Sequence, residues 1–448
     1  MTTATKYKTY SKYKPSSIDW LGDIPDGWEM KKLKHTVKEL VGGGTPDTGN
    51  DQNWTDDENG TPWVNIADMT NAFHIQETEK RVTAMGLAEK NLRILPKNTL
   101  LYSMYASLGK VALLDIEAVT NQAILGVVED KQKAVSDFIK WWLISIESHL
   151  SLFSTSSTQN NLNEFKVKNM PLFLPSLPQQ KSIADFLDRE TAKIDEMVAK
   201  KQKMKELLKE KRQALITHAV TKGLDPKAKM KPSGINWLGD IPEGWEIKKL
   251  KYISDTRVSN VDKKSEDEMP VRLCNYVDVY KNEFIDEKID FMVATATRGQ
   301  IETFELKQGD VIITKDSETP DDIGVPAYVK LENTENVVCG YHLAISTPNK
   351  TDLLGKYLFR LFQSKLFRSY FEISCNGVTR FGLDTYSVFN ADIILPALSD
   401  QRTITDFLDR KTAKIDEMMK KVETQIEKLQ EYRQALITDA VTGKIMVN

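Results

Sequence analysis

The chain has 448 residues, of which 40% are hydrophobic and 28% charged, with a formal net charge of −3. This length exceeds that of one ordinary domain, and the composition is typical of a soluble globular protein with roughly two to four folding units. The mild acidity excludes a strongly basic, free-standing nucleic-acid binder, so DNA binding would need a local patch or a partner that shares it.

Neither a membrane span nor a secretory signal is expected. The longest apolar runs, such as residues 138–146, are too short to cross a bilayer, and the first fourteen residues carry charge without an apolar core. The cysteines Cys274, Cys339 and Cys375 have no paired spacing, which argues against a disulfide framework and a zinc cluster. We therefore expect a cytoplasmic protein with reduced thiols.

In chain order, the first distinctive element is a turn-rich phrase that occurs twice. WLGDIPDGWE begins at Trp20, and WLGDIPEGWE begins at Trp237. Recurrence of two tryptophans with glycine and proline in fixed register indicates a duplicated structural unit.

The stretches that follow each phrase share a skeleton but little identity. LPKNTLLYS at 95–103 is shaped like LKQGDVIIT at 306–314, and residues 109–127 parallel residues 324–346. Each is a turn that leads into a β-rich run. A common fold with different exposed residues indicates that the two halves recognise different things.

Each half ends in a predicted long amphipathic helix. IADFLDRETAKIDEM at 183–197 recurs as ITDFLDRKTAKIDEM at 404–418. A helix of roughly 45 residues would be about 65 Å long. One position of the heptad is mostly apolar over five repeats, as a coiled coil requires; it holds Leu187, Ile194, Lys201, Leu208 and Leu215 in the first copy and Leu408, Ile415, Val422, Leu429 and Leu436 in the second.

We expect these two helices to pair with each other in antiparallel fashion, which would create a pseudo-two-fold axis. Pairing with another molecule is the alternative. The polar residues on the seam, Lys201, Lys211 and Gln425, are interpreted as devices that fix the register.

Catalytic motifs are missing from the sequence. It has no GxxxxGK[ST] phosphate loop and no Asn-Pro-Pro or Asp-Pro-Pro turn of the kind that an amino-group methyltransferase carries. Asp26 with Glu29 and Lys31 is too compressed for a nuclease metal site, and the five histidines are scattered without HExxH. We expect a chain that catalyses nothing alone and holds no metal.

Several loops carry residues suited to DNA. Glycine backbone can approach phosphate closely, amides can bind adenine, lysine can bind phosphate and arginine can bind guanine. For each loop an ordinary solvated turn is the alternative, and for the two tyrosines it is simple packing. The candidate DNA-binding residues are Gly43, Gly44, Thr45, Tyr105, Ser107, Lys110, Ser157, Thr158, Gln159, Asn160, Asn161, Lys166, Lys315, Ser317, Tyr341, His342, Asn376, Thr379 and Arg380.

Several short phrases follow one another in the first half: GGGTP, GTPWVNIADM, VTAMGL, YSMYASLGKVA and TNQAI. The proline-bounded junction LFLPSLPQQKSIADFLD precedes the first long helix. In order and spacing, these phrases resemble those of the specificity subunits of type I restriction–modification systems. The resemblance covers nearly the whole chain beyond the first fourteen residues.

The resemblance implies an α+β fold in which two mixed α/β target-recognition domains are joined by two long helices that form an antiparallel coiled coil, with a pseudo-two-fold internal repeat. The second domain departs from the first: it lacks the glycine triplet and has KDSETPDD where the first has MYAS. The implied parts are an N-terminal tail at 1–14, a first recognition domain at 15–173, a first helix and linker at 174–231, a second recognition domain at 232–394 and a second helix at 395–448.

The resemblance also implies partners. Each domain would read one half of a split, asymmetric site in double-stranded DNA, and two methyltransferase subunits would methylate adenine N6. Restriction subunits would add ATP-dependent cleavage. S-adenosylmethionine, ATP and Mg are then expected on the partners, and no cofactor on this chain. The repeated aromatic residues are the candidate partner contacts, namely Trp20, Trp28, Trp237, Trp245, Phe186 and Phe407.

Two other classes remain open on the residues alone. A self-contained DNA-modifying enzyme would need a cofactor site that the sequence does not reveal. A protein-only coiled-coil scaffold would have no reason to keep the fold of two large domains while changing their surfaces.

Overall fold

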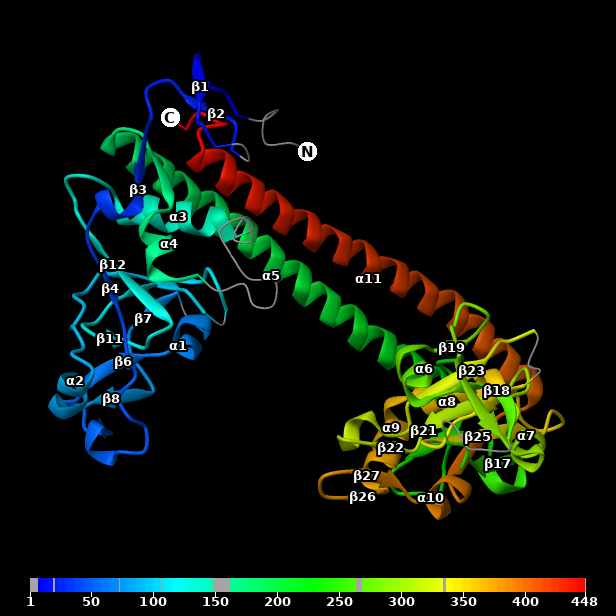
Figure 1. The fold of residues 1–448 in the computed structure, drawn as a ribbon. Helices are drawn as coiled ribbons and strands as arrows, with labels where there is room; N and C mark the ends of the chain where they lie inside the picture. Colours follow the sequence, from blue (N-terminus) through cyan, green and yellow to red (C-terminus); the bar gives the residue numbers. More distant parts are fainter. Residues whose placement is uncertain are drawn as a thin grey trace. The chain divides into compact units, whose positions relative to one another are not determined.

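The computed structural model describes residues 7–18, 21–71, 73–105, 107–147, 162–262, 268–332 and 336–447. The chain divides into a first unit, Met1–Gln202 with Thr424–Asn448, and a second unit, Lys203–Glu423. Each unit holds a mixed α/β domain and parts of the two long helices, α5 (Leu177–Lys222) and α11 (Leu398–Val441) (Figure 1). This agrees with the predicted α+β fold class.

The main sheet of the first unit has five strands in the order β4-β12-β9-β10-β7. All neighbours are antiparallel except β10 and β7, which are parallel. The side chains of β9 and most of those of β12 are buried, because the sheet is covered on both faces. The strands are β4 (Val37–Gly42), β7 (His74–Ile75), β9 (Leu100–Ser103), β10 (Val111–Leu114) and β12 (Ile124–Glu129).

Helix α3 (Ser136–Ile146) joins this sheet to α5. Its Phe138 and Trp142 are 0% and 1% exposed, and they share a core with Ile183 and Leu187 of α5. Lys140 of α3 donates to Asp188 of α5 over 2.7 Å. Figure 1 shows α3 lying along α5. The mixed α/β domain is thereby fixed to the helix within its own unit.

A smaller sheet in the first unit has the order β11-β6-β8-β5. One of its short helices, α2, packs on η3 and β8. The elements are η3 (Asp51–Asn53), β5 (Trp54–Thr55), β6 (Thr61–Val64), α1 (Ile66–Asn71), β8 (Lys80–Val82), α2 (Ala84–Glu89) and β11 (Val119–Thr120).

The second unit repeats this plan. Its main sheet has the order β17-β25-β21-β23-β19, again antiparallel except for the last pair. Helix α8 (Gly355–Gln363) occupies the place of α3, and its Arg360 donates to Asp409 of α11 over 2.8 Å. The strands are β17 (Ser254–Val258), β19 (Phe284–Ile285), β21 (Val311–Thr314), β23 (Pro326–Val329) and β25 (Leu343–Pro348).

Two further sheets complete the second domain, β20-β18-β24 and β22-β27-β26. The first corresponds to β8-β6-β11. The elements are β18 (Met269–Cys274), α6 (Tyr276–Lys281), β20 (Met292–Ala296), α7 (Arg298–Phe304), β22 (Asp316–Ser317), η6 (Pro320–Asp322), β24 (Val337–Cys339), α9 (Lys365–Ile373), β26 (Cys375–Gly377) and β27 (Phe381–Leu383).

Equivalent junctions connect each domain to its helices. Two antiparallel strand pairs, a one-turn helix and a five-residue helix recur in both units. They are β1 (Tyr13–Pro15), β2 (Asp23–Pro25), β3 (Glu29–Lys32), η2 (Leu33–His35), α4 (Glu164–Lys168) and β13 (Pro171–Leu174) in the first, and β14 (Met230–Pro232), β15 (Asp240–Pro242), β16 (Glu246–Lys249), η5 (Leu250–Tyr252), α10 (Thr385–Phe389) and β28 (Asp392–Leu395) in the second.

The long helices are paired in each unit. In the first, Arg433 donates to Asp195 over 2.8 Å; in the second, Arg212 donates to Asp416 over 2.8 Å. In both units residue numbers rise along α5 as they fall along α11, which confirms antiparallel pairing within the chain. Six of the ten predicted seam residues are at most 7% exposed, and a seventh is 8% exposed; these are Leu187, Ile194, Leu208, Leu408, Ile415, Val422 and Leu436.

Two of the polar seam residues bind each other. Lys201 Nζ donates to Gln425 Oε1 over 2.6 Å. Because this bond forms in one alignment of the two helices only, it supports the interpretation of these residues as register devices.

The repeated tryptophan phrase packs on a helix end in each unit. Gly443 and Gly223 follow α11 and α5 with φ of +72° and +77°, the conformation that ends helices at glycine. Trp28 lies against Gly443, and Trp245 lies against Gly223. The phrase therefore covers the end of a long helix.

The predicted borders at 173/174 and 394/395 fall in β13 and β28, immediately before the long helices begin. They stay a prediction. Among the described residues, the structure has no helix with the length and apolarity that a bilayer span requires.

Candidate nucleic-acid interface

A hollow of about 410 Å³ opens in the second unit. Segments far apart in the sequence line it: helix α6, the stretch from β22 to η6, the residue before β25, and the hairpin of β26 and β27. Its lining is polar and aromatic, and consists of Tyr276, Tyr280, Asp316, Ser317, Glu318, Thr319, Asp322, His342 and Arg380.

Asp316 organises one wall of the hollow. Its carboxylate accepts hydrogen bonds from Lys315 Nζ at 2.8 Å and from His342 Nδ1 at 2.9 Å. Burial opposes ionisation of this carboxyl group, but the bonds from Lys315 and His342 outweigh burial and lower the pKa of Asp316. The three side chains are thereby held in fixed orientations.

Two tyrosines form a second wall. The rings of Tyr276 and Tyr280 stack with centroids 5.7 Å apart, one turn apart on α6. Tyr280 Oη donates to Asp322 at 3.1 Å, and this bond raises the pKa of Tyr280. The capping box of Asn275 and Asp278 fixes the first turn of the helix. The sequence analysis missed these tyrosines, whose signal is their four-residue spacing after a cap.

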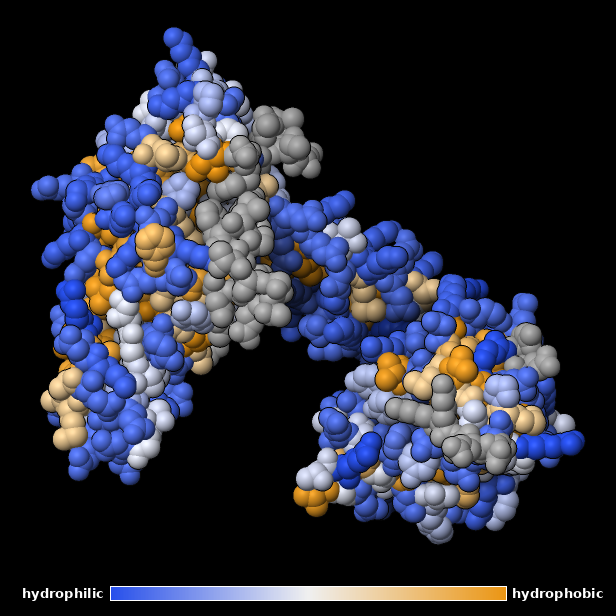
Figure 2. Space-filling view, in the orientation of Figure 1, coloured by the Kyte–Doolittle hydropathy of each residue, from blue (hydrophilic) through white to orange (hydrophobic). Residues whose placement is uncertain are grey.

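The hairpin of β26 and β27 carries Arg380 at the hollow and Asn376 and Thr379 beside it. All three side chains are exposed. Gly377 has φ of +145°, and a Cβ there would lie 2.0 Å from the Arg380 carbonyl oxygen, so only glycine fits this tight turn. Val378 at the tip is 90% exposed, and Figure 2 shows apolar atoms at the place where Figure 1 has this hairpin.

The structure thus brings most of the second-half candidates together. Ser317, His342 and Arg380 line one hollow, Lys315 binds its Asp316, and Tyr341 is 51% exposed with its ring against His342. Guanidinium, imidazole, hydroxyl and carboxylate groups can donate to and accept from base edges. The hollow therefore offers donors and acceptors of the kind that base edges bind, and a DNA contact there stays a prediction.

The glycine loop of the first unit approaches protein rather than open space. A Cβ on Gly43 would lie 2.2 Å from the carbonyl oxygens of Thr120 and Asn121. The carbonyl of Gly44 accepts from the Trp63 indole at 2.9 Å, and Thr45 binds Gln122. Close packing against the β11 turn accounts for Gly43, and a Cβ on Gly44 would lie 3.0 Å from the Leu92 side chain. A phosphate contact at this loop stays a prediction.

Three other first-half candidates surround the turn between β9 and β10. Tyr105 is half-buried against the main core, as the packing alternative predicted. Ser107 has φ of +38°, and its carbonyl accepts from Ser103 Oγ at 2.5 Å. Lys110 pairs with Glu147 at 3.3 Å on the surface. Lys166 lies in α4, and Ser157, Thr158, Gln159, Asn160 and Asn161 lie outside the described residues.

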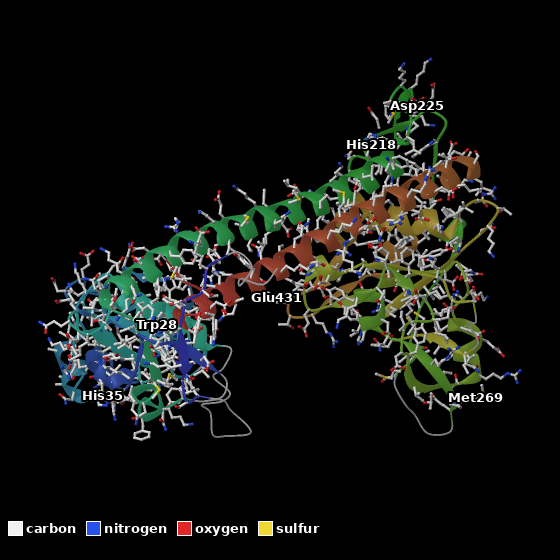
Figure 3. The ribbon with its side chains drawn as sticks, turned by 90° about the horizontal axis from the view of Figure 1, so that it is seen from above. Trp28, His35, His218, Asp225, Met269 and Glu431 are labelled. Carbon is white, nitrogen blue, oxygen red and sulfur yellow. The ribbon has the colours of Figure 1, made fainter. Side chains whose placement is uncertain are left out.

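Most of the repeated aromatic residues pack within the fold, and their role as partner contacts stays a prediction. Trp28, Trp245 and Phe186 are 2%, 6% and 8% exposed, and Figure 3 shows Trp28 among the side chains of its unit. Phe407 packs half-buried on the second core, and Trp237 stacks on Tyr370 with centroids 5.1 Å apart. Trp20 lies outside the described residues. Trp28, Trp245 and Phe186 therefore leave little surface for a partner, whereas Trp237 is 36% exposed.

Within the described part of the chain, no three His, Cys, Asp or Glu side chains gather as metal ligands would. Cys274 and Cys339 face each other across β18 and β24, and burial raises the pKa of both thiols. They are core residues.

Comparison with known proteins places these features in a family. The model of the type I restriction modification DNA specificity domain matches residues 25–206 and 242–428. The MjaIX specificity subunit of Methanocaldococcus jannaschii is 28% identical over 249 residues, which is 55% of each chain. The EcoKI specificity subunit of Escherichia coli is 22% identical over 442 residues, 95% of this chain and 90% of that one.

Two solved structures share the fold. One belongs to work on complex assembly and conformational transition of the type I R-M system; it has a TM-score of 0.68 at 16% identity and covers 94% of this chain and 99% of that one. The HsdS subunit from Thermoanaerobacter tengcongensis has a TM-score of 0.50 at 15% identity, with 94% and 98% covered. Since the family model matches most of both repeats, the chain belongs to the type I restriction–modification DNA specificity family.

Proposed function

We propose that this chain is the non-catalytic DNA-recognition subunit of a type I restriction–modification complex. Each unit reads one half of a split, asymmetric target, and the chain positions two methyltransferase subunits that methylate adenine N6. Restriction subunits on the same complex add ATP-dependent cleavage. S-adenosylmethionine, ATP and Mg belong to those partners, and the complex acts on DNA in the cytoplasm.

The observation that carries the proposal is that the two units share one fold but differ in the residues that their loops expose. Both main sheets have the same strand order and the same single parallel pair. The residues after the equivalent strands β9 and β21 differ completely: Met104 and Tyr105 in one unit, Lys315, Asp316 and Ser317 in the other. Surfaces that differ in this way suit two different half-sites, hence an asymmetric target.

The sequences of the two long helices are evidence for the binding of two copies of one partner. Residues on an exposed helix face can change freely between two repeats unless a partner binds them. The two domains differ widely in sequence, so the repeats have diverged elsewhere. Yet many exposed positions hold the same residue in α5 and α11. Among these pairs are Asp185 and Asp406, Arg189 and Arg410, Lys193 and Lys414, Glu196 and Glu417, and Met197 and Met418.

Expression with the methyltransferase subunit encoded beside it tests the proposal. In a host whose DNA lacks the modification, genome-wide mapping should show methylated adenines in a split, asymmetric motif with a fixed gap, one adenine per strand. The methyltransferase subunit without this chain is the control and should leave the motif unmodified. A well-formed complex that modifies nothing would contradict the proposal and favour a protein-only scaffold.

A further inference from the structure

An exposed aromatic side chain occupies the same place in both units. Phe165 in α4 is 73% exposed, and Tyr386 in α10 is 72% exposed. Each lies three residues after a fully buried leucine, Leu162 or Leu383, and two before a fully buried valine. A large ring kept in water at equivalent points of two diverged domains needs an explanation other than core packing.

Both rings are presented by the same set of hydrogen bonds. The first aromatic turn, residues 163–169, is capped by Asn163, whose side chain accepts from the Lys166 backbone at 2.9 Å. The second aromatic turn, residues 384–390, is capped by Asp384, which accepts from the Ser387 backbone at 3.3 Å.

At the other end of each turn, an asparagine amide donates to the carbonyl oxygen of the exposed residue itself. Asn169 donates to Phe165 at 2.7 Å, and Asn390 donates to Tyr386 at 2.9 Å. The backbone that carries each ring is therefore fixed before any partner arrives. Such preorganisation lowers the entropic cost of binding.

A second exposed ring and a cation lie beside each aromatic turn. The turns pack on η2 and η5, where the backbone N–H of Leu33 donates to Met170 and that of Leu250 donates to Ala391, both at 2.9 Å. The exposed ends of these one-turn helices are Lys34 with His35 and Lys251 with Tyr252. Figure 3 shows His35 at the edge of its unit, away from Trp28.

We propose that the two aromatic turns are equivalent docking points, each of which takes one of the two methyltransferase subunits. The partner would offer an apolar socket for Phe165 or Tyr386, with acidic side chains that face Lys34 or Lys251. This inference rests on the proposed function, because that function supplies two copies of one partner.

A protein partner fits these turns better than DNA. Contacts with the DNA backbone use mainly cations, hydroxyls and backbone amides, whereas aromatic anchors concentrate binding energy at the centre of protein interfaces. The turns are alike in both units, whereas the residues that follow the equivalent strands β9 and β21 differ. A feature that both units keep points to a partner that both units share.

Removal of each ring in the full complex tests the inference. We would prepare Phe165→Ala, Tyr386→Ala and the double variant with the methyltransferase subunit, and count bound copies by native mass spectrometry over a titration. Each single variant should weaken one of the two binding events about tenfold or more, and the double variant should weaken both. Tyr386→Phe should bind as the unchanged chain does.

Matched controls separate this role from folding and from DNA contact. Met85→Ala and Met269→Ala remove exposed apolar side chains, 52% and 45% exposed, and should keep both copies bound. Unchanged binding of two copies by the double variant would overturn the inference. So would intact partner binding with weakened DNA binding, which would make the rings DNA contacts. If the unchanged chain itself binds no methyltransferase subunit, the proposed function fails first.

Discussion

At the scale of single residues, charged side chains of the second unit occupy two different settings. One is the hollow proposed to contact bases, and the other is the contact between the domain and α11. Asp316 fixes Lys315 and His342 at the hollow, and Arg380 approaches the same hollow from a glycine-tightened hairpin. Elsewhere in the unit, Arg360 is 3% exposed and donates to Asp409. The first group should act in recognition and the second in stability.

Arg380→Ala should weaken recognition of the second half-site alone. An arginine that contacts a base edge is worth about 1–3 kcal/mol of discrimination, so the variant should methylate its motif more slowly and accept changes at one position. Motif mapping with the methyltransferase partner measures this. Arg298→Ala, which removes an 85% exposed arginine on α7, is the matched control. Loss of the first half-site instead would contradict the assignment.

Asp409→Asn should destabilise the second unit at neutral pH. It removes the carboxylate that lies 2.8 Å from the buried guanidinium of Arg360 and leaves only Glu283 at 3.9 Å. This costs about 1–3 kcal/mol, toward the low end because the Asp409 side chain is 36% exposed. Urea unfolding at pH 7 measures the loss. Glu417→Gln, which changes an exposed carboxylate paired with Lys421, should leave the unfolding midpoint nearly unchanged.

The same pair predicts a pH dependence. Burial of Asp409 opposes ionisation, but hydrogen bonds from Arg360 and Lys356 outweigh it and lower its pKa in the folded state. Its contribution to stability is therefore full above the unfolded value of about 3.9 and is lost as the pH falls through the folded value. The difference in unfolding free energy between the unchanged chain and Asp409→Asn should shrink below pH 4. A constant difference would contradict this cause.

At the scale of elements, the antiparallel helices are fixed by ion pairs that the repeat itself supplies. Arg433 with Asp195 and Arg212 with Asp416 are the same two sequence positions, exchanged between the helices. Arg212 is the more buried of the two arginines and also binds Glu283. In each unit, one repeat thus provides the arginine and the other provides the aspartate.

A charge exchange tests this register. Asp195→Lys and Arg433→Glu should each lower the unfolding free energy by about 0.5–1 kcal/mol, as partly exposed pairs do, and the double variant should recover most of the loss. The corresponding cycle at Arg212 and Asp416 should show the stronger coupling. If the losses of unfolding free energy in the single variants simply added up in the double variant, the ion pairs would not fix the register.

The helices were predictable from sequence, whereas the hollow was not. A seven-residue period is a local signal, and Leu187, Ile194, Leu408 and Ile415 repeat it through regular helix. The hollow joins residues near 276, 316, 342 and 380, which only the sheets bring together. The phrases that contain Trp28 and Trp245 were recognisable as a repeat, but the burial of these rings at a helix end was not, because it leaves no periodic pattern in the sequence.

At the scale of the whole molecule, the end of each long helix lies next to the first strand of a domain. The chain links the two in one unit and has its ends there in the other. In the second unit, residues 223–229 lead from the end of α5 into β14. In the first unit, the end of α11 lies beside β1: Tyr13 Oη donates to Gly443 at 3.0 Å, and the Met446 backbone donates to Lys8 at 2.6 Å. The termini of the described chain therefore lie where the second unit has a continuous connection.

A circular permutant should consequently fold and function. We would join residue 447 to residue 7 by a short linker and open the chain between Asp225 and Pro226. Helix content and melting temperature should match the unchanged chain, and the methylated motif should be the same. A chain opened between Lys203 and Met204, inside α5, is the control that should fail. Loss of folding in the first permutant would contradict the equivalence of the two connections.

The central claim is that each domain reads its own half of the target. Its most direct test is to replace residues 232–394 by a second copy of residues 15–173 and map methylated adenines with the same partner. Since the two helix repeats run in opposite directions, the account predicts a symmetric motif made of two inverted copies of one half of the original target. Persistence of the original asymmetric motif would contradict the claim.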